Sequence, residues 1–208
     1  MSVFSAMQFL FMPLWGRASD RYGRRPVLLV GLVASTVFYG MFGVAASMRS
    51  LVGLFIARIG AGIAGATIGT AQAYIADTTS KENRAKGMAL IGAAFALGFT
   101  LGPSLGIVAL LFGGEVSMSP WPGYLASGLS GLALLLAILM LPESRSDETP
   151  AEERKLFDTV ALRNALATPS IGYLLVTSLI AVFSFSLFEG TLSLQIDAIL
   201  TGLKDETQ

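Results

Sequence analysis

Six apolar stretches, separated by short polar segments, constrain the fold of this chain more than any other feature. They cover roughly Ser2–Gly16, Pro26–Ser47, Leu51–Tyr74, Gly87–Phe112, Trp121–Leu141 and Ser170–Gly190. A helix that crosses the hydrocarbon core of a bilayer needs about 20 mostly apolar residues, and most of these stretches reach that length. The sequence therefore predicts an all-α fold, a polytopic membrane helix bundle with about six transmembrane helices.

The composition agrees with a membrane protein and excludes several classes of function. Only 13% of the 208 residues are charged, whereas soluble domains average about 25%. Fourteen basic and fourteen acidic residues cancel, so a nucleic-acid-binding protein is not expected. The chain contains no Cys and no His, which excludes thiolate metal sites, nearly all zinc sites and the catalytic triads that need His. We expect no enzyme activity, no cofactor and no metal site.

Lys and Arg residues are concentrated in alternate polar segments, which predicts the orientation. The segments after the first, third and fifth apolar stretches hold Arg17, Arg21, Arg24, Arg25, Lys81, Arg84, Lys86, Arg145, Arg154, Lys155 and Arg163. Loops rich in Lys and Arg face the cytoplasm, so these three segments are predicted to be cytoplasmic. We expect a multi-pass protein of the cell membrane, with its N-terminus and the segment after Gly190 outside.

One polar segment divides the chain unequally. Residues 142–168 form a short run of mixed charge, which is typical of a soluble linker. Apolar residues near helical spacing favour a short amphipathic helix around Glu152–Leu166. We therefore expect three parts: five transmembrane helices in residues 1–141, a cytoplasmic linker in 142–168, and one further helix in 169–208.

The segment Gly16–Pro26 reads G-R-A-S-D-R-Y-G-R-R-P and joins the first two stretches. Two helices must reverse direction within this predicted loop, and its two glycines supply permissive backbone. The four arginines would anchor such a loop at the anionic inner leaflet, which is one interpretation of the segment. In the other, Asp20 has a specific role, either pairing with a nearby Arg or capping the N-terminus of another helix.

This segment resembles the loop signature of the major facilitator superfamily, G-x-L-a-D-r-x-G-r-r, which lies between the second and third helices of that family. Ala18 replaces the usual Leu. The flanking runs Met7–Pro13 and Arg24–Leu29 are similar to the tetracycline/proton antiporter branch. The resemblance implies a partial major facilitator fold that covers helices two to seven, with the first family helix missing. It also implies a gating role for the signature residues, which are Gly16, Asp20, Arg21, Gly23, Arg24 and Arg25.

Asp77 lies at the cytoplasmic end of the third stretch. The resemblance implies that an acid here pairs with the later Arg of the signature, which corresponds to Arg24. We therefore predict an Asp77–Arg24 interaction that holds the inward-facing side closed. The run Pro142–Arg145 resembles the P-E-S/T-R run that closes the sixth family helix.

Arg58 lies inside the third stretch, about two turns from its outer end. A cation in a membrane span costs several kcal/mol, so it either faces a polar interior or partner, or snorkels to the outer surface. The position resembles the R-x-x-x-G motif of the fourth family helix, which implies a part in proton coupling. Glu189, near the outer end of the sixth stretch, is a second candidate for proton coupling if it is buried, and a solvated loop residue if it is not.

Three glycines recur at four-residue spacing in the fourth stretch, at Gly98, Gly102 and Gly106. They make a groove on one helical face, and Pro103 removes a backbone hydrogen bond, which allows a bend. A tightly packed, kinked helix is compatible with this pattern. The pattern also resembles the antiporter motif of the fifth family helix, G-x-x-x-G-P-x-x-G-G, in which Ile107 replaces the last Gly.

The resemblance implies secondary active transport, in the form of proton-coupled efflux of small amphipathic compounds such as drugs. Its partners would be a small-molecule substrate, protons and the lipid bilayer. Members of the family have two six-helix halves with the transport site between them. We expect this chain to be a piece of a transporter, completed by the missing half or by self-association. The alternatives are a non-transporting membrane remnant or helix-interaction protein, and a symporter or uniporter of the same family.

Overall fold

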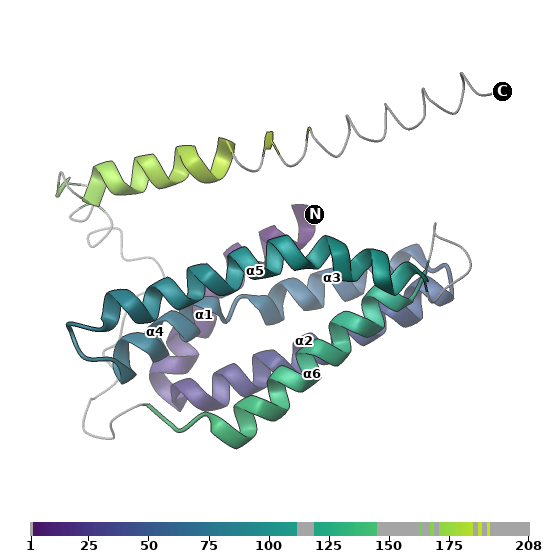
Figure 1. The fold of residues 1–208 in the computed structure, drawn as a ribbon, viewed down its shortest axis with the longest axis horizontal. Helices are drawn as coiled ribbons and strands as arrows, with labels where there is room; N and C mark the ends of the chain where they lie inside the picture. Colours follow the sequence, from purple (N-terminus) through teal and green to yellow (C-terminus); the bar gives the residue numbers. More distant parts are fainter. Residues whose placement is uncertain are drawn as a thin grey trace. The chain divides into compact units, whose positions relative to one another are not determined.

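The computed structural model describes residues 2–111 and 119–144, together with 163, 167–168, 171–184, 187–188 and 191. Most of these residues are helical and none of them forms a β-strand, so the predicted all-α fold is confirmed. Figure 1 labels six helices: α1 (Ser2–Tyr22), α2 (Arg24–Ser47), α3 (Leu51–Gly65), α4 (Ile68–Thr78), α5 (Arg84–Leu111) and α6 (Trp121–Met140).

Within the described part of the chain, four helical segments are long and apolar enough to cross a membrane, and they match the second to fifth predicted stretches. They are Arg24–Ser47, Leu51–Thr78, Arg84–Leu111 and Trp121–Met140. The sixth stretch contributes a shorter apolar helix, Ile171–Ser184. Helix α1 is not among the four, and it carries Arg17, Asp20 and Arg21 near its C-terminal end.

The reversal between the first two helices is tighter than the sequence predicts. Helix α1 continues to Tyr22 and α2 begins at Arg24, so Gly23 alone lies outside the helices. The predicted loop over Gly16–Pro26 is therefore wrong in extent. Gly23 makes the turn because its φ of 101° and ψ of 157° lie in a region open essentially to glycine only.

The third predicted span is interrupted in the structure. Helix α3 ends at Gly65, and α4 begins after two residues that leave the helical pattern. At this break the N–H of Ala66 donates to the Ile63 carbonyl at 3.3 Å, which is a tighter turn than an α-helix. The indole N–H of Trp15 on α1 donates to the same carbonyl at 2.8 Å. The break is thus stabilised by a contact from another helix.

The helices of the bundle pack through small residues. Helix α6 runs antiparallel along α2, as Figure 1 shows, and α3 contacts both α1 and α2. The backbones of α2 and α6 approach so closely that a Cβ atom on Gly123 would lie 2.6 Å from the backbone nitrogen of Gly43. Among the described residues, the buried apolar ones are seven alanines and Val27, while many Leu, Ile and Phe side chains are exposed. Membrane helices associate by this kind of close backbone packing, because lipid provides no hydrophobic driving force.

The chain divides into two compact units, Met1–Arg154 and Lys155–Gln208. Helices α1 to α6 belong to the first unit, and the helix Ile171–Ser184 belongs to the second. The amphipathic helix predicted around Glu152–Leu166 and the candidate residue Glu189 lie outside the described residues. The division into residues 1–141, 142–168 and 169–208 stays a prediction.

Candidate functional site

Arg24, the first residue of α2, connects the ends of three helices. Its Nε donates to the Asp77 carboxylate of α4 at 3.1 Å. A terminal nitrogen of the same guanidinium donates to the Asp20 carboxylate and, at 2.6 Å, to the hydroxyl of Ser19, both on α1. The structure therefore contains the Asp77–Arg24 contact that the resemblance implies. Of the two interpretations of Asp20, it shows the local pairing with an arginine.

Glu143, which follows α6, caps the N-terminus of α2. Its two carboxylate oxygens accept hydrogen bonds from the backbone N–H groups of Arg24 at 3.0 Å and Arg25 at 3.2 Å. An anion at a helix N-terminus satisfies unpaired N–H groups and interacts favourably with the helix dipole. Sequence reasoning missed this role, and the resemblance of Pro142–Arg145 to a family run was the one signal that pointed to the residue.

Further contacts hold the end of α6 to the same region. The Arg25 guanidinium donates to the Ile138 carbonyl at 3.0 Å, and the Tyr74 hydroxyl of α4 donates to the Pro142 carbonyl at 3.1 Å. We call Ser19, Asp20, Arg24, Asp77 and Glu143 the charge cluster. It lies where α1 and α4 end, α2 begins and the chain leaves α6.

The other signature residues lie beside the charge cluster. The Arg21 guanidinium lies 5.5 Å from the centre of the Tyr22 ring. No heavy atom of a described residue outside the local helix backbone lies within 4 Å of the position that a Cβ on Gly16 would take, so close packing among these residues does not explain this glycine. In the turn before α5, hydrogen bonds from its own backbone N–H and from the Ser80 hydroxyl lower the pKa of the Glu82 carboxyl.

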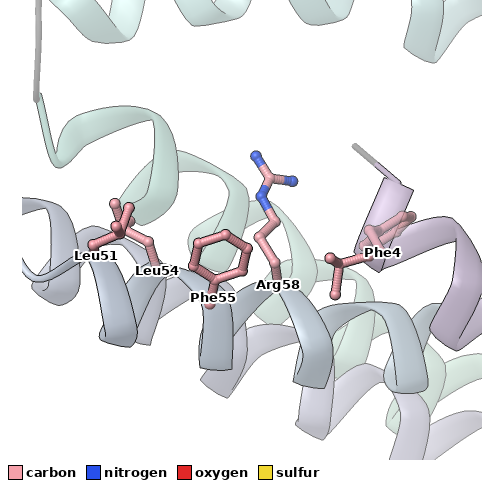
Figure 2. Close-up of a pocket in the computed structure, with 6 residues that line it drawn as sticks. Phe4, Leu51, Leu54, Phe55 and Arg58 are labelled. Atoms are coloured by element: carbon pink, nitrogen blue, oxygen red, sulfur yellow. The ribbon is translucent and has the colours of Figure 1, made fainter.

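Arg58 lies on α3, away from the charge cluster. Figure 2 shows its side chain beside Phe55 and Phe4, in a pocket of about 130 Å³. The Arg58 guanidinium lies 4.6 Å from the centre of the Phe42 ring of α2, which is a cation–π contact. The second candidate for proton coupling, Glu189, lies outside the described residues.

The glycine face of α5 is open within the described part of the chain. Helix α5 continues through Pro103, and no atom lies within 4 Å of a Cβ placed on Gly98, Gly102 or Gly106. The interpretation of a tightly packed helix therefore does not hold among these residues. An apolar hollow of about 470 Å³ adjoins this face, and its lining residues are Ile68, Ile91, Ala94, Phe95, Gly98 and Phe99.

Comparison with known proteins agrees with this architecture. The chain is 40% identical over 161 residues to the class C tetracycline resistance protein of Escherichia coli, which is 77% of this chain and 39% of that protein. It is 34% identical over 179 residues to the class E protein of the same organism, or 85% of this chain and 42% of that protein. The crystal structure of the human organic anion transporter MFSD10 (TETRAN) superimposes with a TM-score of 0.58 and 37% identity, over 75% of this chain and 33% of that chain.

The chain thus spans between 33% and 42% of the length of these relatives. A family model described as Major Facilitator Superfamily matches residues 1–203. This is a family of multi-pass membrane transport proteins, not of enzymes, which agrees with the four apolar spans and with the exclusion of triad and thiol chemistry. The relatives also support the resemblance to the tetracycline branch. The chain belongs to the major facilitator superfamily.

Proposed function

We propose that this chain is part of a secondary active transporter that exports small amphipathic compounds in exchange for protons. The observation that carries the proposal is the charge cluster, in which one guanidinium joins Asp20 and Asp77 across three helices of an apolar bundle. The names of the relatives support it, since they are tetracycline resistance proteins and an organic anion transporter. In this proposal the signature segment, the α4–α5 turn and the linker face the cytoplasm.

The charge cluster has the properties that a gate requires. Alternating access needs two states that differ by only a few kcal/mol, so that substrate and protons can shift the balance between them. The side chains of Arg24, Asp20 and Asp77 are 17%, 35% and 37% exposed. Ion pairs that water reaches in this way contribute about 1 kcal/mol or less each. Such contacts stabilise one state and still open on the time scale of transport.

Arg58 acts in this proposal on a proton carrier, because an arginine stays protonated at every physiological pH. A carboxylate near its guanidinium keeps its charge down to lower pH and releases its proton more readily. Glu189 remains a second, separate candidate for proton coupling in this proposal. The open face of Gly98, Gly102 and Gly106, with Pro103, would let a helix of the other half approach the α5 backbone closely.

The size of the native product decides which protein to assay. An antibody to residues 143–155 on a blot of membrane fractions distinguishes a product near 21.9 kDa from one about twice as large. The larger product is expected for a two-half transporter. A product of 21.9 kDa favours the second candidate function, a helix-interaction protein, to which the open glycine face of α5 also points.

Transport itself is tested in everted membrane vesicles that contain the native product. With a proton gradient we expect the vesicles to accumulate tetracycline, followed by its fluorescence, and to lose this activity with a protonophore or with Arg58→Ala. Accumulation that persists after the gradient is collapsed would contradict antiport. A gradient-driven uptake with the opposite proton dependence would instead indicate a symporter.

A further inference from the structure

We propose that the pocket around Arg58 binds the carboxylate of a small amphipathic anion. The pocket has a volume of about 130 Å³, and among the described residues that line it Arg58 is the one charged side chain, beside Val3, Phe4, Leu51, Leu54 and Phe55. One cation in an apolar wall complements a ligand that has one anionic end and an apolar body. The inference names the substrate class of the proposed transporter, and it rests on that proposed function.

Arg58 has no carboxylate partner among the described residues. The acids in this part of the chain are Asp20, Asp77, Glu82 and Glu143, and all four lie in the charge cluster or in the turn before α5. Asp77 follows Arg58 by 19 positions, which corresponds to roughly 28 Å along a helix axis. None of these acids neutralises Arg58.

The geometry of Arg58 leaves its hydrogen-bond donors available. The centre of the Phe42 ring lies 4.6 Å from the central carbon of the guanidinium, a cation–π contact that uses none of its hydrogen-bond donors. The N–H groups point outward in the plane of the guanidinium, where a carboxylate can accept two parallel hydrogen bonds. An arginine whose donors bind no described residue is a typical site for a planar anion.

The apolar walls set the size of the ligand. In Figure 2 the Phe55 ring and the Phe4 side chain flank the Arg58 stem on either side. A dry cavity of about 150 Å³ is known to hold one benzene molecule, so this pocket of about 130 Å³ suits a single aromatic ring or a short alkyl chain. Benzoate combines a ring of this size with one carboxylate, and its ring would contact Phe4 and Phe55.

The test measures binding of 4-fluorobenzoate to the purified chain in uncharged detergent, by ¹⁹F NMR. We expect Arg58→Gln to weaken binding about ten-fold or more, because hydrogen bonds to a charged group exceed the ~1.4 kcal/mol that corresponds to ten-fold in Kd. Arg58→Lys, which keeps the charge and loses the planar fork, is expected to lose less. Arg49→Gln removes a cation from the α2–α3 turn and serves as the matched control, with no change expected.

Two further measurements separate the contribution of the carboxylate from that of the apolar wall. The neutral isostere 4-fluorobenzamide is expected to bind weakly and equally to the wild type and to Arg58→Gln. Phe4→Ala, which removes part of the apolar wall, is expected to weaken the binding of both compounds. Circular dichroism and size exclusion confirm that each variant is folded, and Arg58→Lys keeps the test valid if Arg58→Gln does not fold.

Equal affinity of the wild type and Arg58→Gln for 4-fluorobenzoate overturns the proposal. Two acids outside the described residues are Glu115, between α5 and α6 in the sequence, and Glu189. The proposal is also overturned if binding occurs only after Glu115→Gln or Glu189→Gln, because an acid of the chain would then occupy the pocket. The assay uses neither a membrane nor a gradient. A protein that binds 4-fluorobenzoate but exports nothing therefore contradicts the transport proposal alone, and one that exports tetracycline but ignores 4-fluorobenzoate contradicts the pocket alone.

Discussion

Arg24 has more partners than the sequence predicts. These extra partners limit how much transport is restored when the charges of Arg24 and Asp77 are exchanged. Its guanidinium contacts Asp77, Asp20 and Ser19. We expect Arg24→Asp and Asp77→Arg each to reduce tetracycline transport strongly, and the double variant to restore only part of it. Rescue is incomplete because the carboxylate introduced at position 24 lies beside Asp20, and like charges repel.

The control for this exchange is Arg21→Asp combined with Asp77→Arg. The Arg21 guanidinium lies 5.5 Å from the centre of the Tyr22 ring, whereas the Asp77 carboxylate accepts a hydrogen bond from Arg24. This pair should show no rescue. If Arg24→Asp with Asp77→Arg transports no better than either single variant, the contact has no role in gating.

A single methyl group at Gly23 should lower the stability of the fold for two reasons. Its φ of 101° and ψ of 157° are strained for any other residue, by about 1–3 kcal/mol. A Cβ there would also lie 2.6 Å from Oε2 of Glu143. We therefore expect Gly23→Ala to lower the thermal unfolding temperature in detergent by several degrees. Gly16→Ala is the matched control, because it lies in α1 with no atom within 4 Å of its Cβ position and should be neutral or slightly stabilising.

At the scale of helices, the cap on α2 depends on a residue far away in the sequence. Glu143 accepts from the backbone N–H groups of Arg24 and Arg25. Removing a capping side chain costs about 0.5–2 kcal/mol, so Glu143→Ala should speed hydrogen exchange in the first turn of α2, measured by mass spectrometry. Glu82→Ala is the control, since the hydrogen bonds of that carboxyl come from its own turn. Unchanged exchange at residues 24–28 would count against the cap.

The sequence predicts the helices well where an apolar run begins and ends at polar residues. The fifth stretch, Trp121–Leu141, differs from α6 by one residue, and the second differs from α2 by two. The break after Gly65 was not predictable, because Ala66 and Thr67 do not interrupt an apolar run. It depends on tertiary contacts, namely the Trp15 hydrogen bond and the close approach of Gly31 to Thr67.

The difference between local patterns and tertiary contacts also explains which contacts of the charge cluster the sequence predicted and which it did not. The Arg24–Asp77 contact follows from a family pattern that spans both segments. The Glu143 cap joins residues 119 positions apart, and no local pattern marks its partners. The extent of α1 was misjudged because Arg, Ala, Ser and Asp are tolerated in a helix, so Gly16 did not end it.

The break between α3 and α4 should respond to a change on α1. Trp15→Phe keeps the ring and removes the N–H that donates to the Ile63 carbonyl, which is worth about 0.5–1.5 kcal/mol. We expect faster hydrogen exchange at residues 64–68 and little change elsewhere. Trp121→Phe, at the start of α6, is the control and should leave this segment unaffected. A uniform increase along the chain would indicate general destabilisation instead.

At the scale of the whole molecule, the first unit is a bundle that packs by alanine and glycine and exposes its larger apolar side chains. Ala57, Ala61 and Ala64 of α3 are at most 2% exposed, while Phe55 and Ile56 on the same helix are each 51% exposed. A soluble protein would bury the larger side chains. The pattern fits a bilayer, in which the exposed Leu, Ile and Phe side chains contact lipid and small residues let the backbones approach.

The orientation of this bundle follows from its basic residues and is testable because the chain has no native Cys. Lys81 lies in the exposed turn before α5, and Met48, 73% exposed, ends α2 at the opposite side of the predicted membrane. The excess of Lys and Arg predicts that Lys81 is cytoplasmic and Met48 is outside. In intact cells a membrane-impermeant maleimide should label Met48→Cys at once and Lys81→Cys only after permeabilisation. The Cys-free parent protein is the control for background labelling. The reverse labelling pattern would place the charge cluster outside the cell, where it could not close an inward-facing gate.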